Sequence, residues 1–158
     1  MKKYYLLLPT LFLFTACNST SALNYFEKDA QSANAIQYTK KTDLIYNKEI
    51  NSLLFATYLN KVNKKYESNK LDSFVVGIHL VNKREHDFIK NDYSITLNGK
   101  KAAMITRLDE NSPLVTSIPL RNNWANYYLI KFENDESQNM KILLTHPTFG
   151  MAQIDFQK

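Results

Sequence analysis

The sequence is poor in cysteine, with a single one, Cys17, among its 158 residues. A lone cysteine cannot close an internal disulfide, even in an exported chain whose surroundings would allow one. It also offers no second thiolate for a zinc site. The sequence therefore excludes a disulfide-stapled scaffold, and the thiol of Cys17 must serve some other purpose.

Glycine and histidine are also scarce, with three residues of each. The glycines stand too far apart to form a phosphate-binding loop, and there is no Gly-x-Ser-x-Gly to place a nucleophile on a tight turn. No two histidines have the spacing of metal ligands. We therefore expect no enzyme, no cofactor and no metal centre. The residues concerned are Gly77, Gly99, Gly150, His79, His86 and His146.

Several polar segments leave weaker alternatives open. The carboxylates at 109–110 and 133–136 could supply the acid/base pair of a glycosidase, and residues 134–137 contain oxygen ligands suited to calcium. Residues 85–87 could hold a metal ion loosely. We interpret these segments as solvated loops. His79 alternates with apolar residues and is expected to be a partly buried structural histidine.

The N-terminus has the features of an export signal. Lys2 and Lys3 precede an uncharged, almost wholly apolar stretch from Tyr4 to Ala16. These 13 residues are fewer than the roughly 20 that a membrane-spanning helix needs. The pattern is typical of a secretory signal, which we assign to residues 1–16.

The end of this stretch resembles the lipobox of bacterial lipoproteins. It reads Phe14-Thr15-Ala16-Cys17, with small residues before the cysteine and Phe14 where leucine is usual. The resemblance implies transfer of diacylglycerol to the Cys17 thiol, cleavage between Ala16 and Cys17, and often acylation of the new amine, for example with palmitate. The alternative is an ordinary signal cut after Ala16, which leaves a free cysteine.

Lipidation of Cys17 would make the lipid bilayer a partner of the chain. Each buried methylene of an acyl chain contributes about 0.8 kcal/mol, so two or three chains would anchor the protein permanently. Residues 17–22 are small and polar after the cysteine and predict a flexible tether. By analogy with enteric bacteria, where Asp after the cysteine favours the inner membrane, Asn18 favours the outer membrane, on its periplasmic or surface face.

The rest of the chain has the length of one domain. Cleavage after residue 16 leaves 142 residues, which we assign to the tether and a single domain at 23–158. The net charge of +5 falls to +3 without Lys2 and Lys3, which is too little to indicate a nucleic acid partner. Between residues 23 and 46 the pattern leaves a short N-terminal helix and extended structure both open.

After Glu49 the hydrophobic period changes to two, which indicates strands with one buried face. Ser52–Leu59 is the first such run, and the lysine-rich Asn60–Leu71 after it is expected to be a long exposed connection. Five further runs alternate in the same way, at 74–80, 93–97, 127–132, 140–145 and 152–156.

Asn98-Gly99 is the strongest hairpin signal, because both turn residues accept positive φ. We expect Ala102–Leu108 to be the return strand of this hairpin, and Asn134–Asn139 to be the loop of a second one. About seven strands at this spacing predict a mainly β fold with an antiparallel β-sandwich. A barrel is the alternative.

Three segments resemble small lipoproteins of campylobacter-type bacteria. They are Ala56–Asn60, Phe74–Gly77 and Leu97–Gly99. The resemblance covers roughly residues 44–158 and implies an immunoglobulin-like β-sandwich behind the lipid anchor, with no known activity and no catalytic residue. The Cys–Trp–Cys framework of antibody domains is missing, because Trp124 has no cysteines to pack against.

A basic stretch is the first candidate for binding. It contains Lys61, Lys64, Lys65 and Lys70. Such a cluster could meet an anionic glycan, lipid headgroups or an acidic partner. The alternative, which we favour for so lysine-rich a chain, is a solubilising loop.

The aromatic segment at 124–128 is the second candidate. Of the neighbours Tyr127 and Tyr128, one must face the core and the other must face outward, and an outward aromatic side chain can anchor a partner. Trp124 and Tyr127 are therefore candidate binding residues. For Trp124 and Tyr128 we favour packing in the core.

These observations predict a membrane-anchored, non-catalytic β-sandwich that binds a protein or glycan in the cell envelope or at the surface. The alternative is an envelope assembly or secretion accessory factor whose sheet edge pairs with a partner strand. An enzyme is the third and least favoured interpretation, because the sequence shows no evident set of catalytic residues.

The lipid anchor can be tested with Cys17→Ser. Without the thiol the chain cannot be acylated, so we expect the protein to leave the membrane fraction or to be mislocalised while its β-domain stays folded. Fractionation of cells followed by immunoblotting measures this. A variant that remains membrane-bound at normal levels would contradict the lipoprotein assignment.

Overall fold

The computed structural model describes residues 34–134 and 136–158. The chain divides into two units, Met1–Ala30 and Gln31–Lys158, and all the described residues belong to the second. None of the helices in this part of the chain is both long and apolar enough to span a membrane.

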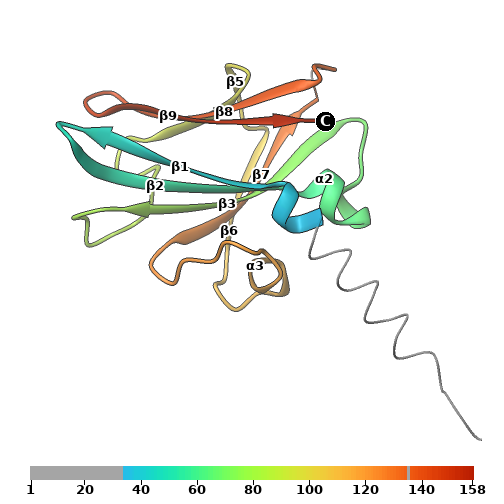
Figure 1. Ribbon diagram of the computed structural model, residues 1–158, viewed down its shortest axis with the longest axis horizontal. Coiled ribbons are helices and arrows are strands. Elements are labelled where there is room, and N and C mark those ends of the chain that lie inside the picture. Colours follow the sequence, from blue (N-terminus) through green and yellow to red (C-terminus); the bar gives the residue numbers. More distant parts are fainter. Residues whose placement is uncertain (1–33, 135) are drawn as a thin grey trace, which may run out of the picture. The chain divides into compact units, whose positions relative to one another are not determined.

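Strands dominate the described residues and form two antiparallel sheets (Figure 1). One sheet has the order β1-β2-β3-β7-β6 and the other has the order β5-β4-β8-β9. The described ranges also contain three short helices and a helical turn at 34–37. The strands are β1 (Thr39–Tyr46), β2 (Glu49–Tyr58), β3 (Leu71–Leu80), β4 (Ser94–Leu97), β5 (Lys100–Lys101), β6 (Met104–Leu108), β7 (Asn126–Glu133), β8 (Asn139–His146) and β9 (Gly150–Gln157). The helices are α2 (Leu59–Val62), η1 (Lys64–Tyr66) and α3 (Pro113–Thr116).

The two sheets enclose a shared hydrophobic core, as the predicted sandwich requires. Alternate residues of β3 at 74, 76, 78 and 80 are buried there, and those of β8 at 140, 142 and 144 meet them from the other sheet. In β9 the residues at 152, 154 and 156 are buried in the same way. The period-two patterns therefore predicted the inward faces of these strands correctly, and the mainly β fold is confirmed.

A second apolar cluster covers the outer face of the five-stranded sheet. The segment around α3 folds over β7 and buries Val75 and Tyr127 from outside. The Tyr127 ring lies directly against Gly77 of β3, where a Cβ would lie 2.6 Å from Cε1 of Tyr127. The absence of a side chain at residue 77 therefore leaves room for this buried ring. The middle of the sheet is therefore buried on both faces.

The two lateral edges of the sandwich differ. At one edge β1 lies against β9 of the other sheet, where Lys40 Nζ donates to the Asp155 carbonyl oxygen at 2.6 Å. At the other edge β6 pairs only with β7. The facing edge strand β5 has just two residues, so the side chains of β6 stay mostly exposed.

The hairpin at Asn98-Gly99 is confirmed, with φ of 49° and 82° at its turn residues. Its predicted return strand is wrong. After the turn only the two residues of β5 run back along β4, and residues 104–108 cross to the other sheet, where they pair with β7 as β6. The chain changes sheets at 102–103, and Ala103 N donates to the Lys131 carbonyl oxygen there.

The second predicted hairpin, at Asn134–Asn139, is also wrong. This segment follows β7, which pairs with β3 and β6, and precedes β8, which pairs with β4 and β9. It therefore crosses between the sheets instead of joining neighbouring strands.

The region before residue 46 contains a strand that the sequence left open. The described part of the possible helix is one turn at 34–37, and β1 begins at Thr39. Residues 23–33 lie outside the described residues, so the predicted domain start at residue 23 stays a prediction.

Candidate binding site

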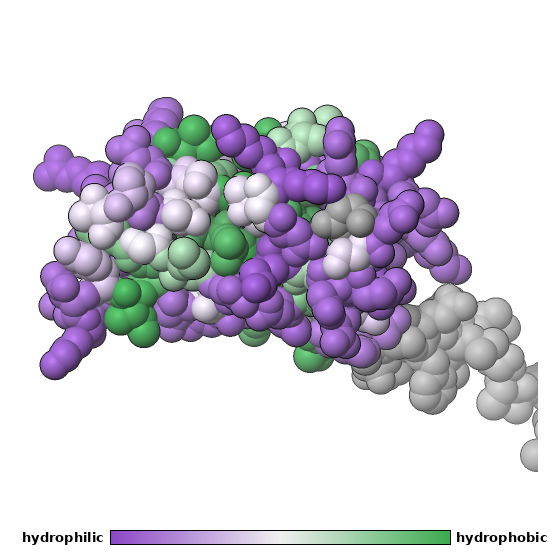
Figure 2. All heavy atoms as spheres, turned by 90° about the horizontal axis from the view of Figure 1, so that it is seen from above, coloured by the Kyte–Doolittle hydropathy of each residue, from purple (hydrophilic) through white to green (hydrophobic). Residues whose placement is uncertain are grey.

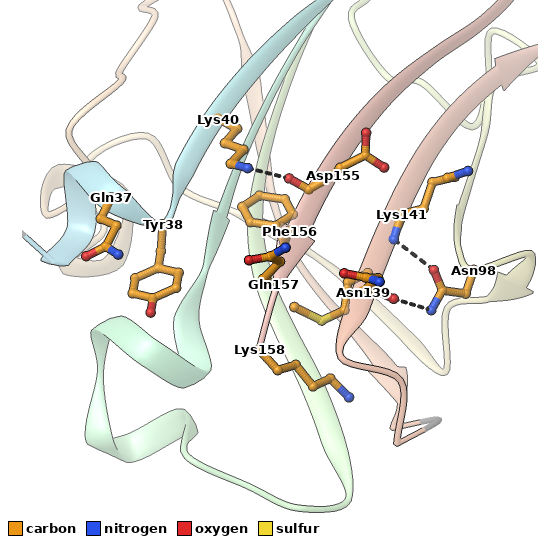
Figure 3. A pocket seen from close by; sticks show the side chains of 11 residues that line it. Gln37, Tyr38, Lys40, Asn98, Asn139, Lys141, Asp155, Phe156, Gln157 and Lys158 are labelled. Carbon is orange, nitrogen blue, oxygen red and sulfur yellow. Dashed lines mark hydrogen bonds between the residues drawn. The ribbon is translucent and has the colours of Figure 1, made fainter.

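A polar cleft of about 730 Å³ lies where β9 passes beside β1, with β8 as the next strand beyond β9 (Figure 3). Most of its lining side chains carry amide, ammonium or hydroxyl groups. They are Gln37, Tyr38, Lys40, Asn98, Asn139, Met140, Lys141, Asp155, Phe156, Gln157 and Lys158.

Strand alternation turns the polar side chains of the cleft away from the core. In β8, Met140 and Ile142 point inward, so Lys141 between them points outward. Asp155 lies directly opposite Lys141 on β9 and faces outward for the same reason. Its two carboxylate oxygens accept hydrogen bonds from Gln153 Nε2 at 3.0 and 2.9 Å.

Lys40 joins the two sheets at the cleft. Besides its hydrogen bond to the Asp155 carbonyl oxygen, its ammonium lies 5.5 Å from the centroid of the Phe156 ring. A cation over an aromatic face is attracted by the ring quadrupole. Lys40 is therefore held in place before any ligand arrives.

Lys158 forms the deepest polar contact at this end of the domain. Its ammonium lies 3.0 Å from Asp72 Oδ2, and the other carboxylate oxygen of Asp72 accepts a hydrogen bond from the Tyr58 hydroxyl at 2.9 Å. The side chains of Lys158 and Asp72 are only 14% and 1% exposed. Burial raises the pKa of Tyr58, and the hydrogen bond to Asp72 raises it further.

The Asn98-Gly99 turn is fixed to the start of β8 and forms another wall of the cleft. Asn98 Nδ2 donates to the Asn139 carbonyl oxygen at 3.0 Å, and Asn98 Oδ1 accepts from Lys141 N at 2.8 Å. The side-chain amide of Asn98 thus makes the two hydrogen bonds to the β8 backbone that a neighbouring strand would otherwise make.

The residues that line the cleft include a single carboxylate. Asp155 is the one carboxylate among the lining residues, and it already accepts from Gln153. A glycosidase would need two carboxyl groups facing one another across the cleft. Within the described ranges, no three His, Cys, Asp or Glu side chains lie close enough together to hold a metal ion.

The predicted basic stretch lies at the same end of the domain as the cleft. Lys61, Lys64, Lys65 and Lys70 are all exposed. Their segment follows Tyr58, whose backbone N donates at 2.9 Å to the carbonyl oxygen of Tyr38 in the cleft wall. The sequence also pointed to Lys40 as a basic residue elsewhere in the chain, but it gave no sign that Lys40 lies near Lys141 and Lys158, because only the folding of distant strands brings these three together.

This segment is more ordered than the exposed connection that the sequence predicted. It forms α2 and η1, and the Asn60 side chain binds it to β3 by donating to the Leu71 carbonyl oxygen at 2.7 Å and accepting from Ser73 N at 2.8 Å. Leu59 is buried and Tyr66 packs on the outer cluster. The lysines therefore extend from a fixed scaffold.

The structure exposes Trp124, which was expected in the core, and buries Tyr127, which was expected to face outward. Trp124 is 73% exposed, so the favoured core packing is wrong for this residue. Tyr127 is 2% exposed, and its hydroxyl accepts from Asn122 N at 2.6 Å and donates to Asn122 O at 3.1 Å. Tyr127 does leave the inner face, but the α3 segment covers it. Tyr128 packs in the core as predicted.

His79 is a partly buried structural histidine, as predicted. Its Nδ1 lies 3.0 Å from the Trp124 carbonyl oxygen, and its ring centroid lies 4.8 Å from that of His86. These contacts connect β3 to the loops on either side of it.

No family model, curated protein or solved structure matches the chain. The resemblance to campylobacter-type lipoproteins and the immunoglobulin-like topology therefore stay predictions. Cys17 and the export signal lie outside the described residues.

The ion pair between Lys158 and Asp72 can be tested with Lys158→Met. The substitution leaves a buried carboxylate without its cation, and we expect it to lower the free energy of unfolding by about 3 kcal/mol. The matched control is Lys141→Met, an exposed lysine of the same cleft, for which we expect a change within about 0.5 kcal/mol. Urea unfolding measures both, and equal, small effects would contradict the role of Lys158.

Proposed function

We propose that this chain is a lipid-anchored, non-catalytic protein of the cell envelope that binds an anionic glycan in the polar cleft. The observation that carries the proposal is the gathering of three lysines with amide side chains around one opening, where a single carboxylate is already engaged.

The donor groups of the cleft fit carboxylate or phosphate groups together with hydroxyls. Charge-assisted hydrogen bonds from ammonium groups are about twice as strong as neutral ones. Lys40 and Lys158 are held by contacts within the protein. Lys141 is exposed and has no ion pair among those found in the described residues, so we assign the main contact with the anionic group to it.

The remaining lining residues suit the neutral part of a glycan. Gln37 and Gln157 are exposed amides that can exchange hydrogen bonds with sugar hydroxyls. Tyr38 is half-buried and packs edge-on against Tyr58, with ring centroids 6.4 Å apart, which leaves an ordered aromatic ring in the wall. A cleft of this volume falls in the range of ordinary ligand sites.

The anchoring part of the proposal rests on the sequence at Cys17. A binding domain held on a membrane by acyl chains samples only the ligands near that surface, so a cleft of modest affinity is sufficient for a role in the envelope. The outer membrane remains the compartment that Asn18 favours.

An assembly or secretion accessory factor is the second candidate. It is favoured by β6, an edge strand whose Met104 and Ile105 are 50% and 38% exposed. The surface seen in Figure 2 is mainly hydrophilic, and hydrophobic side chains emerge on it in separate patches. An edge strand with exposed apolar residues can accept a strand from another protein.

The glycan proposal predicts a preference for acidic over neutral sugars. We expect the protein to bind a hyaluronan tetrasaccharide, which carries uronate groups, and to bind the uncharged chitotetraose much more weakly. Lys141→Gln should weaken uronate binding about tenfold by removing a charge-assisted hydrogen bond. Calorimetry or ligand-observed NMR measures the affinities.

Lys48→Gln is the matched control, because Lys48 lies in the β1–β2 turn at the other end of the strands. It should leave the affinity unchanged. Equal binding of both tetrasaccharides, or equal affinities for the two lysine variants, would contradict the assignment of the cleft.

A further inference from the structure

We propose that the exposed lysines at 61, 64, 65 and 70 form a surface that rests on anionic lipid headgroups of the membrane that holds the anchor. We call this surface the basic end. The inference takes its orientation from the proposed anchoring at Cys17, and it goes beyond the cleft to a second, larger contact.

The described chain begins at the basic end. Tyr38 N donates to the Asn34 carbonyl oxygen at 3.1 Å, and the Tyr38 carbonyl oxygen accepts from Tyr58 N, which directly precedes α2. Asn134 connects the other side by donating through its backbone N to Lys70 O at 3.0 Å and through Nδ2 to Asn69 O at 3.1 Å. The lysines and the entry of the chain therefore share one end of the sandwich.

Sixteen residues separate Cys17 from Asn34. A segment of this length spans at most about 55 Å. The segment that follows Cys17 therefore enters the domain at the basic end. A domain anchored through Cys17 can bring this end to the bilayer.

The charge distribution fits an anionic surface at this end. Residues 59–70 carry four lysines and a single acid, Glu67. The three carboxylates in the sequence at 133–136 are equal in number to Lys100, Lys101 and Lys141, so these two groups add no net charge. At the opposite end, residues 81–93 carry three cations and three anions, and residues 109–125 carry two acids and one arginine.

The four lysines lie at different points of the segment, so each can contact a different lipid headgroup. Lys61 lies in α2, Lys64 and Lys65 lie in η1, and Lys70 directly precedes β3. Because their backbone is held by the Asn60 hydrogen bonds to β3, they lose little further backbone freedom on contact. Each lysine at an anionic membrane surface is expected to raise partitioning about fivefold.

Vesicle partitioning of the processed chain tests the inference. The protein is produced from residue 17 onward with Cys17→Ser, so that no acyl chain contributes; the strands and both apolar clusters lie within Gln31–Lys158 and supply this domain with its own core. It is mixed with vesicles of phosphatidylcholine alone, or with vesicles in which phosphatidylglycerol replaces about a third of the lipid. Sedimentation gives the bound fraction.

Two variants with equal net charge locate the contact. The first replaces Lys61, Lys64, Lys65 and Lys70 by Gln, and the second replaces Lys48, Lys83, Arg84 and Lys90 by Gln. We expect the parent and the second variant to bind vesicles that contain phosphatidylglycerol, and the first variant to lose partitioning by roughly six hundredfold, about fivefold for each of its four lysines. Binding should also weaken with added salt, which shortens the screening length.

Several results would overturn the inference. These are no binding to either kind of vesicle, equal binding to both kinds, or equal losses in the two variants, which would indicate attraction through net charge alone. These outcomes are distinct from failure of the proposed function. Acylation of Cys17 is tested by fractionation of the native chain, and glycan binding is tested by Lys141, which neither variant changes.

Discussion

A single buried carboxylate organises the end of the domain that carries the cleft. Asp72 begins the buried part of β3, and an ionised side chain there would be costly without partners. Tyr58 of β2 and Lys158 after β9 supply those partners, so three strands from two sheets are held at one point. Lys158 also contacts Asn134 and thereby joins the β7–β8 connection to the same network. The cleft wall and the basic end both depend on this arrangement.

The strands were largely predictable because the alternation of apolar and polar residues within each segment shows which face of that strand is buried. Phe74–Leu80 and Ala152–Phe156 alternate so regularly that their inward faces follow from the sequence alone. The assignment of strands to sheets is a different problem. Residues 104–108 and 139–146 follow their predecessors after short connections, yet both change sheets, since their pairing depends on distant strands. β1 could not be assigned from the sequence because most of its residues are polar or exposed.

In the candidate site, too, residues that are adjacent in the sequence could be grouped in advance, whereas residues brought together by folding could not. Adjacent lysines in one segment could be grouped from the sequence, whereas Lys40, Lys141 and Lys158 come to one cleft only because β1 packs against β9 and β9 pairs with β8. Tyr127 was misjudged because a strand can be covered on both faces. The apolar residues at 113–120 were the available signal that a segment with few charges would fold over it.

In the proposed arrangement the β-sandwich rests on the membrane through its basic end, and the cleft lies beside that surface. The most direct test is a depth measurement on the acylated full chain in vesicles containing phosphatidylglycerol. Nitroxide labels are attached at cysteines that replace Lys65 in one sample and Lys48 in another. The account predicts that the label at 65 lies at headgroup depth, while the label at 48 is relaxed by water-soluble reagents. The proposed arrangement would be contradicted if both labels lay fully in water, or if the label at 48 lay deeper in the bilayer than the label at 65.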